Sequence, residues 1–564
     1  MITLHTIGSY LANRLAQIGL KHHFVVPGDY NLLLLDQLLS NQEMQQIGCA
    51  NELNASFAAE GYARANGAAA CVVTFSVGAL SAFNGIGGAY AEDLPVILIS
   101  GGPNTNDAGA RHLLHHTLGT HNFSYQRQMA EHLTCAAVAV TSADDAPYLI
   151  DHAIRAALRE HKPCYIEIPC NLAGTACASP GPISSLTQVV PSDPATLQAA
   201  VTASVAFLAS CARPMLLAGP TLRAAGAQAA FRTLAEALGS AVAVMPSAKG
   251  LFPEDHPQFA GIAWGEVSTD GCNELLEWAD GLLCAGTVFT DYTTVGWTSM
   301  PAATPIIDAG FDRIIVPGHD FSHLRLADFL SALADQVQTN PATMGEYERI
   351  RTPTVPATVA TAQGKLTRHE LFLQVQALLT AESTLLVETG DSWFNGIYMT
   401  LPPGACFEIE MQWGHIGWSV PASLGYALGA PQRRLIALIG DGAFQLAAQE
   451  VAQMIRHKLP VTLFLINNRG YTIEAEIHDG PYNNIKNWDY AGLIDVFNAE
   501  SGMGKGLRAR TASELAAAIQ LAKQNTQGPT LIECAIDRND CTRQLISWGR
   551  RVATANARPP REAH

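Results

Sequence analysis

The sequence predicts an α/β protein of three doubly wound domains with mostly parallel sheets. Short apolar runs rich in β-branched residues alternate with helical patterns along the chain, which is typical of parallel strands covered by helices. At 564 residues the chain is too long for one hydrophobic core. Two stretches rich in Pro, Ser and small polar residues, 178–194 and 339–365, divide it. We therefore expect domains at 1–180, 190–345 and 360–564.

The N-terminal domain begins with an amphipathic helix that carries Ile7, Leu11 and Leu15 on one stripe. The uncharged stretch 71–91 is long enough to resemble a membrane span. Its glycine, serine and asparagine residues, followed by an acidic pair, instead favour a strand, a glycine turn and a buried helix. Further strands of this domain are predicted at 24–26 and 96–99.

The middle and C-terminal domains continue the alternation of strands and helices. In the C-terminal domain a pair of buried strands encloses the helical pattern 445–457, which predicts a βαβ unit. The end of the chain is predicted as helix, strand and closing helix, and the closing helix carries Trp548. The predicted strands are 215–217, 385–387, 434–440, 461–467 and 530–534, and the C-terminal helices are 513–522 and 540–552.

The composition excludes several classes of function. The chain carries 34 basic and 50 acidic residues, a net charge of −16, without a basic run, which argues against nucleic-acid binding. The first helix lacks the continuous apolar region of a signal peptide. The twelve cysteines contain no CxxC pair, which favours reduced thiols over disulfides or a zinc site. We therefore expect a cytoplasmic protein that binds neither nucleic acid nor membrane.

The most informative motif follows two neighbouring strands of the C-terminal domain. Gly-Asp441-Gly442 ends one strand, and Asn-Asn468-Arg-Gly470 ends the next. Open α/β sheets bind ligands at these strand ends. The Asp441 carboxylate, the Asn468 side-chain oxygen and a carbonyl near Gly470 are hard ligands that suit Mg²⁺ beside a diphosphate. Gly442 lets the backbone approach a phosphate at a helix start; two unrelated turns are the alternative interpretation.

Further motifs accompany this one, at 26–32, 50–54, 59–64, 78–84, 114–116, 388–394, 412–417 and 471–474. Together they resemble thiamine diphosphate enzymes, specifically the pyruvate decarboxylase family of the short bacterial type. The resemblance extends from the first helix to the Trp548 helix. It implies a pyrimidine-binding domain, a middle domain and a diphosphate- and Mg²⁺-binding domain with a C-terminal helix, in this order. It also implies an active site between two identical subunits and a homotetramer formed from two dimers.

In this family thiamine diphosphate carries the chemistry and the protein orients it. The resemblance assigns Glu52 to the pyrimidine ring nitrogen, where a carboxylate lets the cofactor deprotonate its own C2. Taken alone, Glu52 also fits a carboxylate at a helix start. Ile416 corresponds to the apolar wedge that bends the cofactor, and the Gly414 carbonyl to the acceptor of its exocyclic amine. The other residues assigned to the cofactor are Thr389, Asp391, His415, Asp441, Gly442, Ala443, Asn468, Gly470, Tyr471, Thr472 and Ile473.

The resemblance also implies that four titratable side chains lie around the reacting carbon of the substrate: Asp29, His115, His116 and Glu474. They would protonate the enamine that remains after CO₂ leaves and release the aldehyde. His115 and His116 would diverge by about 100° on a regular helix, so both reach one pocket only if their segment is irregular. His112 and His116 also have the i,i+4 spacing of a metal site. An ordinary histidine pair and a surface position for Glu474 remain open as well.

Large side chains predict a small substrate. Tyr292, Trp393 and Trp548 resemble the residues that narrow the family's pocket, which favours pyruvate over aryl oxo acids, although each also fits an ordinary core. We therefore predict a lyase that decarboxylates pyruvate to acetaldehyde and CO₂ through a thiamine diphosphate ylide and an enamine. The competing hypotheses are a decarboxylase of phenylpyruvate or indolepyruvate, a thiamine diphosphate carboligase that forms acetolactate, and a cofactor-binding scaffold without turnover.

Overall fold

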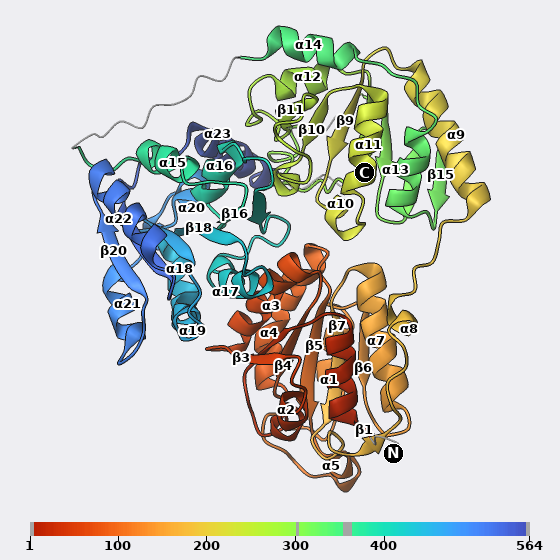
Figure 1. The fold of residues 1–564 in the computed structure, drawn as a ribbon, viewed down its shortest axis with the longest axis vertical. Helices are drawn as coiled ribbons and strands as arrows, with labels where there is room; N and C mark the ends of the chain where they lie inside the picture. Colours follow the sequence, from red (N-terminus) through yellow and green to blue (C-terminus); the bar gives the residue numbers. More distant parts are fainter. Residues whose placement is uncertain (1–4, 300–303, 353–363, 560–564) are drawn as a thin grey trace.

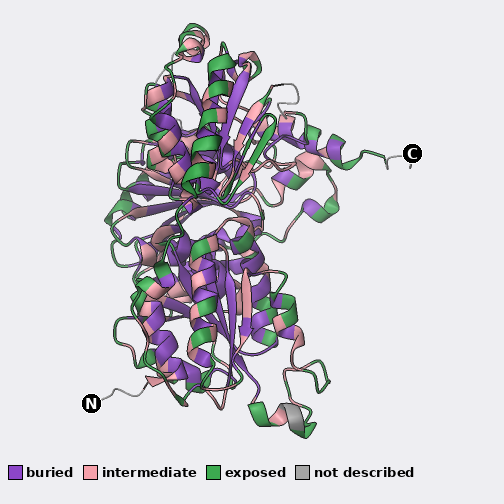
Figure 2. Cartoon of the chain, turned by 90° about the vertical axis from the view of Figure 1, so that its right-hand side faces the viewer, coloured by how far each residue is buried: buried purple, intermediate pink, exposed green. Residues whose placement is uncertain are grey.

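The computed structural model describes residues 5–299, 304–352 and 364–559. Three main β-sheets, each covered by helices, follow one another along the chain and form three α/β domains (Figure 1). The predicted fold class is confirmed. Figure 2 shows that buried residues concentrate in the strands and on the inner faces of the helices, while the outer helix faces are exposed.

The N-terminal sheet has six parallel strands in the order β3-β2-β4-β5-β7-β6. Its central strands β4 and β5 are buried throughout, as expected where helices cover both faces. A short antiparallel pair, β1 (His5–Thr6) and β8 (Ala176–Cys177), joins the two ends of this domain. The strands are β2 (His22–Val25), β3 (Gln45–Gly48), β4 (Ala69–Val73), β5 (Val96–Gly102), β6 (Ala136–Ala139) and β7 (Cys164–Pro169). The helices are α1 (Ile7–Gln17), α2 (Leu32–Leu39), α3 (Glu52–Asn66), α4 (Val77–Ala91), α5 (Thr105–Ala110), α6 (Tyr125–Ala130) and α7 (Ala146–Glu160).

The middle sheet has seven strands in the order β11-β10-β9-β12-β13-β14-β15, of which the last two are antiparallel additions. The strands are β9 (Pro214–Ala218), β10 (Val242–Val244), β11 (Phe259–Ile262), β12 (Gly281–Ala285), β13 (Ile306–Ala309), β14 (Arg313–Val316) and β15 (His319–Ser322). The helices are α9 (Pro194–Ser210), α10 (Thr221–Ala224), α11 (Gln228–Leu238), α12 (Cys272–Trp278), α13 (Leu326–Ala334) and α14 (Ala342–Ile350).

The C-terminal sheet, β17-β16-β18-β19-β21-β20, is parallel and repeats the strand order of the N-terminal sheet. The strands are β16 (Ser383–Val387), β17 (Cys406–Ile409), β18 (Arg434–Gly440), β19 (Thr462–Asn467), β20 (Lys505–Ala509) and β21 (Thr530–Ala535). The helices are α15 (Arg368–Gln376), α16 (Asp391–Tyr398), α17 (Ser419–Gly429), α18 (Asp441–Ala447), α19 (Val451–Arg456), α20 (Thr472–Ile477), α21 (Tyr490–Asn498), α22 (Ala512–Gln524) and α23 (Arg543–Asn556).

The N-terminal and C-terminal domains pack against each other through α3 and α17. A Cβ atom added to Gly61 would lie 2.1 Å from the Ala422 carbonyl oxygen, and one added to Gly425 would lie 1.8 Å from the Ala58 carbonyl oxygen. Only glycine permits this approach of the two helix backbones. The crossing therefore fixes the cofactor-binding domain against the helix that begins at Glu52.

Three local predictions differ from the structure. The predicted helix 445–457 is two helices, α18 and α19, separated by the 3₁₀ turn Ala448–Glu450. The turn before α4 places Ser76, not a glycine, in the left-handed region at φ 53°. Both predicted linkers contain a helix, α8 (Ser184–Thr187) and α14, because Pro and Ser are also common at helix starts. Residues 353–363 of the second linker lie outside the described residues.

Two further observations concern the whole described chain. None of its described helices combines the length and the apolarity that crossing a bilayer requires. All twelve cysteines are free thiols in the described chain.

Candidate cofactor pocket and active site

A pocket lies at the carboxyl ends of β16, β18 and β19, where the sequence predicts the diphosphate and its metal ion. Gly440 at the end of β18 pairs with Ile466 near the end of β19, so the loops after these strands lie side by side. The predicted residues that line the pocket are Thr389, Asp391, Ile416, Gly442, Ala443, Asn468, Gly470, Tyr471, Thr472, Ile473 and Glu474.

Three oxygen-bearing groups, the Asp441 carboxylate, the Asn468 amide and the Gly470 carbonyl, converge beside this pocket. The Asn468 side-chain oxygen lies 3.0 Å from the Gly470 carbonyl oxygen and 3.2 Å from Asp441 Oδ1. The amide nitrogen of Asn468 points the other way and donates to Thr472 Oγ1 at 2.6 Å. Turned by 180°, the same amide would donate to both oxygens and accept the Thr472 hydroxyl, which satisfies it without an ion. A bound cation would select the orientation in which the Asn468 oxygen faces Gly470 and Asp441. All three groups belong to the predicted metal ligands.

The Asp441 carboxylate is fully buried. It accepts the backbone N–H of Gly442 at 2.8 Å and that of Arg469 at 2.5 Å. Burial raises the pKa of this carboxyl group to about 6, and the backbone donors offset some of the rise. Since a buried charge needs a counter-ion and the donors are neutral, a divalent cation would complete the site. The residues present therefore fit Mg²⁺.

The Thr389 hydroxyl and Gly442 make the pocket suitable for a diphosphate. Thr389 Oγ1 is buried and has no hydrogen-bond partner among the described residues. Such a group costs about 1–3 kcal/mol unless it finds a partner, and a phosphate oxygen would provide one. A Cβ atom at Gly442 would lie 2.3 Å from the Tyr471 ring, so a larger residue would displace Tyr471 from the pocket wall.

Asp391 lines the pocket, but its carboxylate faces the C-terminal helix. Its Oδ1 accepts the Thr542 N–H at 3.1 Å and the Thr542 hydroxyl at 2.7 Å, and its Oδ2 accepts the Asn395 amide at 2.9 Å. Thr542 is the N-cap residue of α23. Asp391, the first residue of α16, therefore ties this helix to the helix that carries Trp548.

The chain turns at Ile416, and the glycine that follows fixes this corner. Gly417 has φ 94°, in the left-handed region that favours glycine, and an added Cβ atom would lie 2.9 Å from Leu446 Cβ. Neither Gly414 nor His415 is among the residues that line the pocket. The His415 ring lies 4.9 Å from the Phe57 ring of α3, so this side chain faces the N-terminal domain.

The three aromatic residues of the predicted substrate pocket lie together, although they come from three separate segments. The Tyr292 ring lies 6.0 Å from the Trp393 ring and 4.9 Å from the Trp548 ring. A Cβ atom added to Gly414 would lie 4.0 Å from both Tyr292 and Trp393. Burial, and secondarily the charge of Glu474, raises the pKa of the Tyr292 hydroxyl. The aromatic group therefore lies next to both Gly414 and Glu474.

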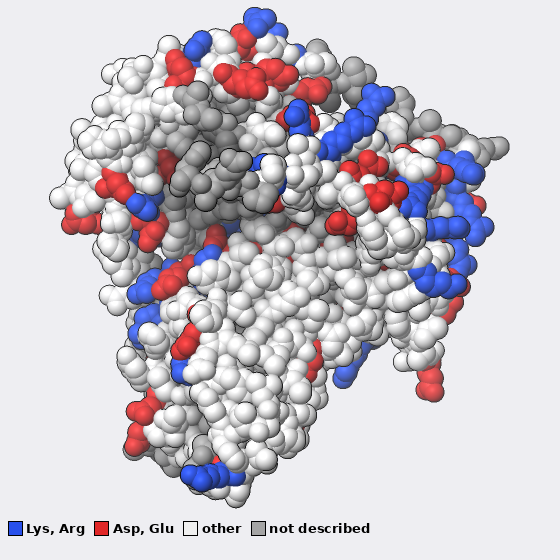
Figure 3. Space-filling view, turned by 180° about the vertical axis from the view of Figure 1, so that it is seen from behind, with Lys and Arg blue, Asp and Glu red and all other residues white. Residues whose placement is uncertain are grey.

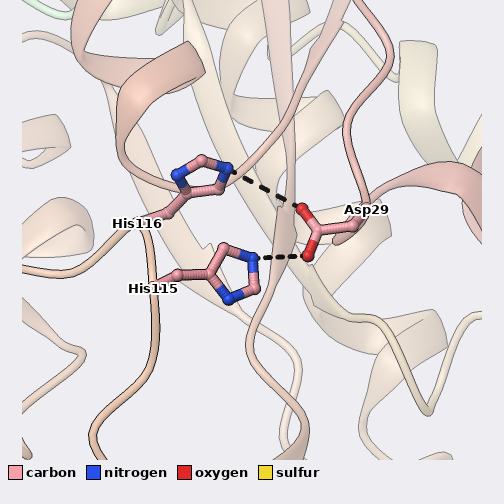
Figure 4. Close-up of side chains that lie close together, drawn as sticks. All are labelled: Asp29, His115 and His116. Carbon is pink, nitrogen blue, oxygen red and sulfur yellow. Dashed lines mark hydrogen bonds and ion pairs between the residues drawn. The ribbon is translucent and has the colours of Figure 1, made fainter.

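Asp29, His115 and His116 form a second cluster, in the N-terminal domain. Figure 4 shows both imidazole rings turned toward the Asp29 carboxylate, with His115 Nε2 2.6 Å from Oδ2 and His116 Nε2 3.8 Å from Oδ1. His116 has φ 56°, so the segment is irregular, as a shared pocket requires. The Tyr30 ring stacks on His115 at 5.0 Å. The spacing from His112 to His116 does not give a metal pair, because the His112 ring bonds to Asp107 at 2.7 Å.

Within one chain this cluster and the pocket lie apart. Asp29, His115, His116 and Glu52 are not among the residues that line the pocket. Figure 1 shows α2 and α5, which flank the Asp29 and histidine loops, at the end of the N-terminal domain that is remote from α16 and α20. Glu52 itself begins α3, whose N-cap Asn51 accepts the Asn54 N–H.

Two buried carboxylates near these sites were not predicted from the sequence. Glu388 follows β16 and accepts donors from two pocket segments. Glu450 reaches across the domain interface and accepts the Ala50 N–H at 3.2 Å and the Asn54 amide at 2.9 Å, on either side of Glu52. For Glu388 the available signal in the sequence was an acidic residue directly after an apolar strand. For Glu450 it was an acidic residue within a helical pattern.

A buried ionic network joins all three domains. Arg64 of α3 lies 2.7 Å from Glu60, 3.4 Å from Glu92 and 3.3 Å from Glu408 of β17, and Glu408 lies 2.8 Å from Arg223 of the middle domain. Acidic groups outnumber basic groups in this network, so the carboxylates are only partly neutralised.

Replacing Glu60 by glutamine should reduce the pH dependence of stability. Burial raises the pKa of Glu60 to about 7, although Arg64 lowers it. The stabilisation that protonated Glu60 gives below its unfolded pKa of 4.5 is therefore lost as the pH rises through about 7. Glutamine cannot ionise, so the variant does not undergo this loss. Between about pH 4.5 and 8, its free energy of unfolding should therefore fall by about 1–3 kcal/mol less than that of the wild type. Urea unfolding across this range measures the difference, and parallel curves would contradict it.

Comparison with known proteins agrees with the fold and the pocket. Residues 5–125 match the N-terminal TPP binding domain of thiamine pyrophosphate enzymes, residues 201–335 the central domain and residues 390–534 the C-terminal TPP binding domain. The chain is 57% identical to a pyruvate decarboxylase of Neurospora crassa over 99% of this chain and 97% of that protein. It is 57% identical to a probable pyruvate decarboxylase of Schizosaccharomyces pombe over 98% and 97%. It is 45% identical to pyruvate decarboxylase 3 of Arabidopsis thaliana over 98% and 94%.

The predicted short bacterial type is not supported, since the relatives at 57% identity are fungal proteins. The motifs that carried this prediction surround the cofactor, and residues constrained by the same cofactor do not distinguish between types of one family. The similarity covers the chain almost completely and includes both cofactor-binding domains. The chain therefore belongs to the pyruvate decarboxylase family of thiamine pyrophosphate enzymes.

Proposed function

We propose that this protein decarboxylates pyruvate to acetaldehyde and CO₂ without oxidation, using thiamine diphosphate and Mg²⁺. The observation that carries the proposal is the convergence of the Asp441 carboxylate, the Asn468 amide group and the Gly470 carbonyl beside a pocket whose buried Thr389 hydroxyl lacks a partner among the described residues. Full-length relatives named as pyruvate decarboxylases support the reaction type.

Thiamine diphosphate, when bound, supplies the carbanion that adds to the 2-oxo carbon and accepts the electron pair when CO₂ leaves. In our proposal Asp441, Asn468 and the Gly470 carbonyl would hold the Mg²⁺, and the residues that line the pocket would bind the diphosphate. Glu52 would hold a proton at the pyrimidine ring nitrogen. The Gly414 carbonyl would accept a hydrogen bond from the exocyclic amine of the cofactor.

Four side chains are proposed to handle protons at the reacting carbon. Glu474 lines the cofactor pocket, and Asp29 contacts both His115 and His116 in the second cluster. A carboxylate and two imidazoles in contact offer several nitrogen and oxygen atoms between which a proton can be passed. Tyr292, Trp393 and Trp548 exclude water, which favours departure of CO₂ from a poorly solvated carboxylate.

We further propose that the second cluster acts on the pocket of a partner subunit, in a homodimer that pairs into a tetramer. The separation of the two groups within one chain supports this arrangement. Figure 3 shows a broad uncharged face on the N-terminal domain. Helix α4 has no charged residue, and its Val77 and Leu80 side chains are exposed, so a protein partner would remove apolar surface from water. The free thiols favour a reducing cytoplasm as the location.

Removal of both cofactors tests the function. We expect chelator-stripped protein to lose pyruvate turnover and to recover it only when thiamine diphosphate and Mg²⁺ are added together, measured as acetaldehyde release. Added singly, neither should restore activity, because the metal and the diphosphate bind one another in the pocket.

A panel of 2-oxo acids separates the competing activities. We expect pyruvate to be used more efficiently than phenylpyruvate or indolepyruvate, since added volume in a tight site costs about 1–3 kcal/mol. A higher kcat/KM for an aryl oxo acid than for pyruvate would identify the aryl acid as the preferred substrate. Acetolactate as the main product would identify a carboligase. Cofactor binding without any product would identify a scaffold.

A further inference from the structure

The Glu388 carboxylate is completely buried behind the cofactor pocket. It accepts four hydrogen bonds. Oε1 accepts the Thr389 N–H at 2.8 Å, and Oε2 accepts the Gly417 N–H at 3.0 Å, the Ser419 N–H at 3.4 Å and the Ser419 hydroxyl at 2.5 Å. The carboxylate itself does not line the pocket. It therefore acts on the pocket only through the segments that it holds.

These two segments both contribute to the pocket wall. Oε1 holds the turn after β16, which presents the unpartnered Thr389 hydroxyl. Oε2 holds the corner between Ile416 and the start of α17. Thr389 and Ile416 both line the pocket, and in the proposed function they contact the diphosphate and the two rings of the cofactor. One carboxylate thus sets the separation between the diphosphate side and the ring side.

The hydrogen bonds require an acid with two accepting oxygens. A glutamine has one oxygen, and its amide NH₂ would face either the Thr389 N–H or the Ser419 donors. Aspartate keeps the charge but is shorter by one CH₂ group, so it reaches only one of the two segments. Burial raises the pKa of Glu388 to about 7, and the four donors act against this rise. No basic side chain is among its hydrogen-bond or ion-pair partners in the described chain.

We propose that Glu388 is a positioning residue that fixes the distance between the Thr389 turn and the Ile416 corner, and thereby sets the affinity for thiamine diphosphate. This inference rests on the proposed function, and it assigns to Glu388 no contact with cofactor or substrate. The bridge consists of protein groups alone, so it can order the pocket without a contribution from the cofactor and lower the cost of binding.

The test is a titration of apoprotein with thiamine diphosphate at saturating Mg²⁺, followed by tryptophan fluorescence. Trp393 is buried beside the pocket and would report binding. We expect Glu388→Gln and Glu388→Asp each to raise the cofactor concentration at half saturation at least about tenfold, since preorganisation is lost in both. The KM for pyruvate, measured at saturating cofactor, should change less than about twofold.

Ser419→Ala is the graded control, because it removes one donor and leaves three. We expect it to weaken cofactor binding by about threefold. If the Glu388 variants do not fold, the Ser419→Ala variant serves as the test. An unchanged cofactor affinity in Glu388→Gln, or a lower melting temperature of the apoprotein without a change in affinity, would overturn the inference. Failure of the wild type to bind thiamine diphosphate would instead overturn the proposed function, and the inference with it.

Discussion

Replacing Glu52 by glutamine should lower pyruvate turnover at saturating cofactor by about a hundredfold or more, the range that general acid–base groups contribute. Glutamine preserves the shape of the side chain but cannot hold an acidic proton at the pyrimidine ring nitrogen. The metal ligands lie in the C-terminal domain and are unaffected, so binding of Mg²⁺ and thiamine diphosphate should remain measurable. The rate of acetaldehyde release and the fluorescence titration of the apoprotein measure the two properties separately.

The competing interpretation of Glu52 predicts a different result. Glu52 is the first residue of α3, where a carboxylate stabilises the helix dipole by about 0.3–1 kcal/mol. If this were its only role, Glu52→Gln would lower the free energy of unfolding slightly and leave kcat near the wild-type value. Glu514, in the first turn of α22, is a matched control, since Glu514→Gln removes a comparable helix-start charge outside the pocket. Near-normal turnover by Glu52→Gln would refute the proposed mechanism even if acetaldehyde is the product.

The proximity of Asp441 and Asn468 could be predicted from the sequence because it depends on local order. Two apolar runs define adjacent parallel strands, and residues that directly follow such strands share one edge of the sheet. Asp441 and Asn468 are therefore brought together by the strand register alone. The same argument placed Thr389 after β16. The break at Ala448–Glu450 was not predictable, since its residues fit helical spacing and the interruption depends on Glu450 reaching α3.

The residues that hold the site in place depend on contacts distant in sequence. Glu388 bonds to Ser419, about thirty residues away, and Arg64 bonds to Glu408, more than three hundred residues away. A buried carboxylate looks like a surface residue in the sequence, because burial of a charge is unusual unless a partner is supplied from elsewhere. The clustering of Asp29 with His115 came from the family resemblance, since no periodic pattern links a strand end to an irregular loop.

The packing of the domains shows the same limit. Gly61 and Gly425 look like helix-weakening residues when each helix is considered alone. Only the crossing of α3 and α17 explains them, because a Cβ atom at either position would overlap the other backbone. The shared strand order of the first and third domains is likewise absent from the sequence as a repeat, since parallel sheets of this kind need only a pattern of buried strands and not a common residue sequence.

Replacing Asp441 by asparagine should abolish activity by preventing cofactor binding. Changes to groups that only support a metal ligand already cost about 10–100-fold in affinity, so loss of the charged ligand should exceed this range. Because the substitution removes a buried charge and keeps the shape of the side chain, the apoprotein should remain folded. Isothermal titration with Mg²⁺ and thiamine diphosphate measures the loss. Asn468→Ala, which removes a neutral ligand, should have a smaller effect, and equal affinities in wild type and Asp441→Asn would contradict the metal site.

The two inactive variants, mixed, test whether one site uses two chains. In a dimer of Glu52→Gln with Asp441→Asn, a shared arrangement concentrates both defects in one site and leaves the other site intact. Random pairing of the two subunit kinds should then restore about a quarter of wild-type activity after denaturation and refolding together. Sites built within single chains would all carry a defect, and the mixture would stay inactive. Recovered activity would thus account for the separation of the Asp29 cluster from the pocket in one chain, because the cluster would act on the pocket of its partner.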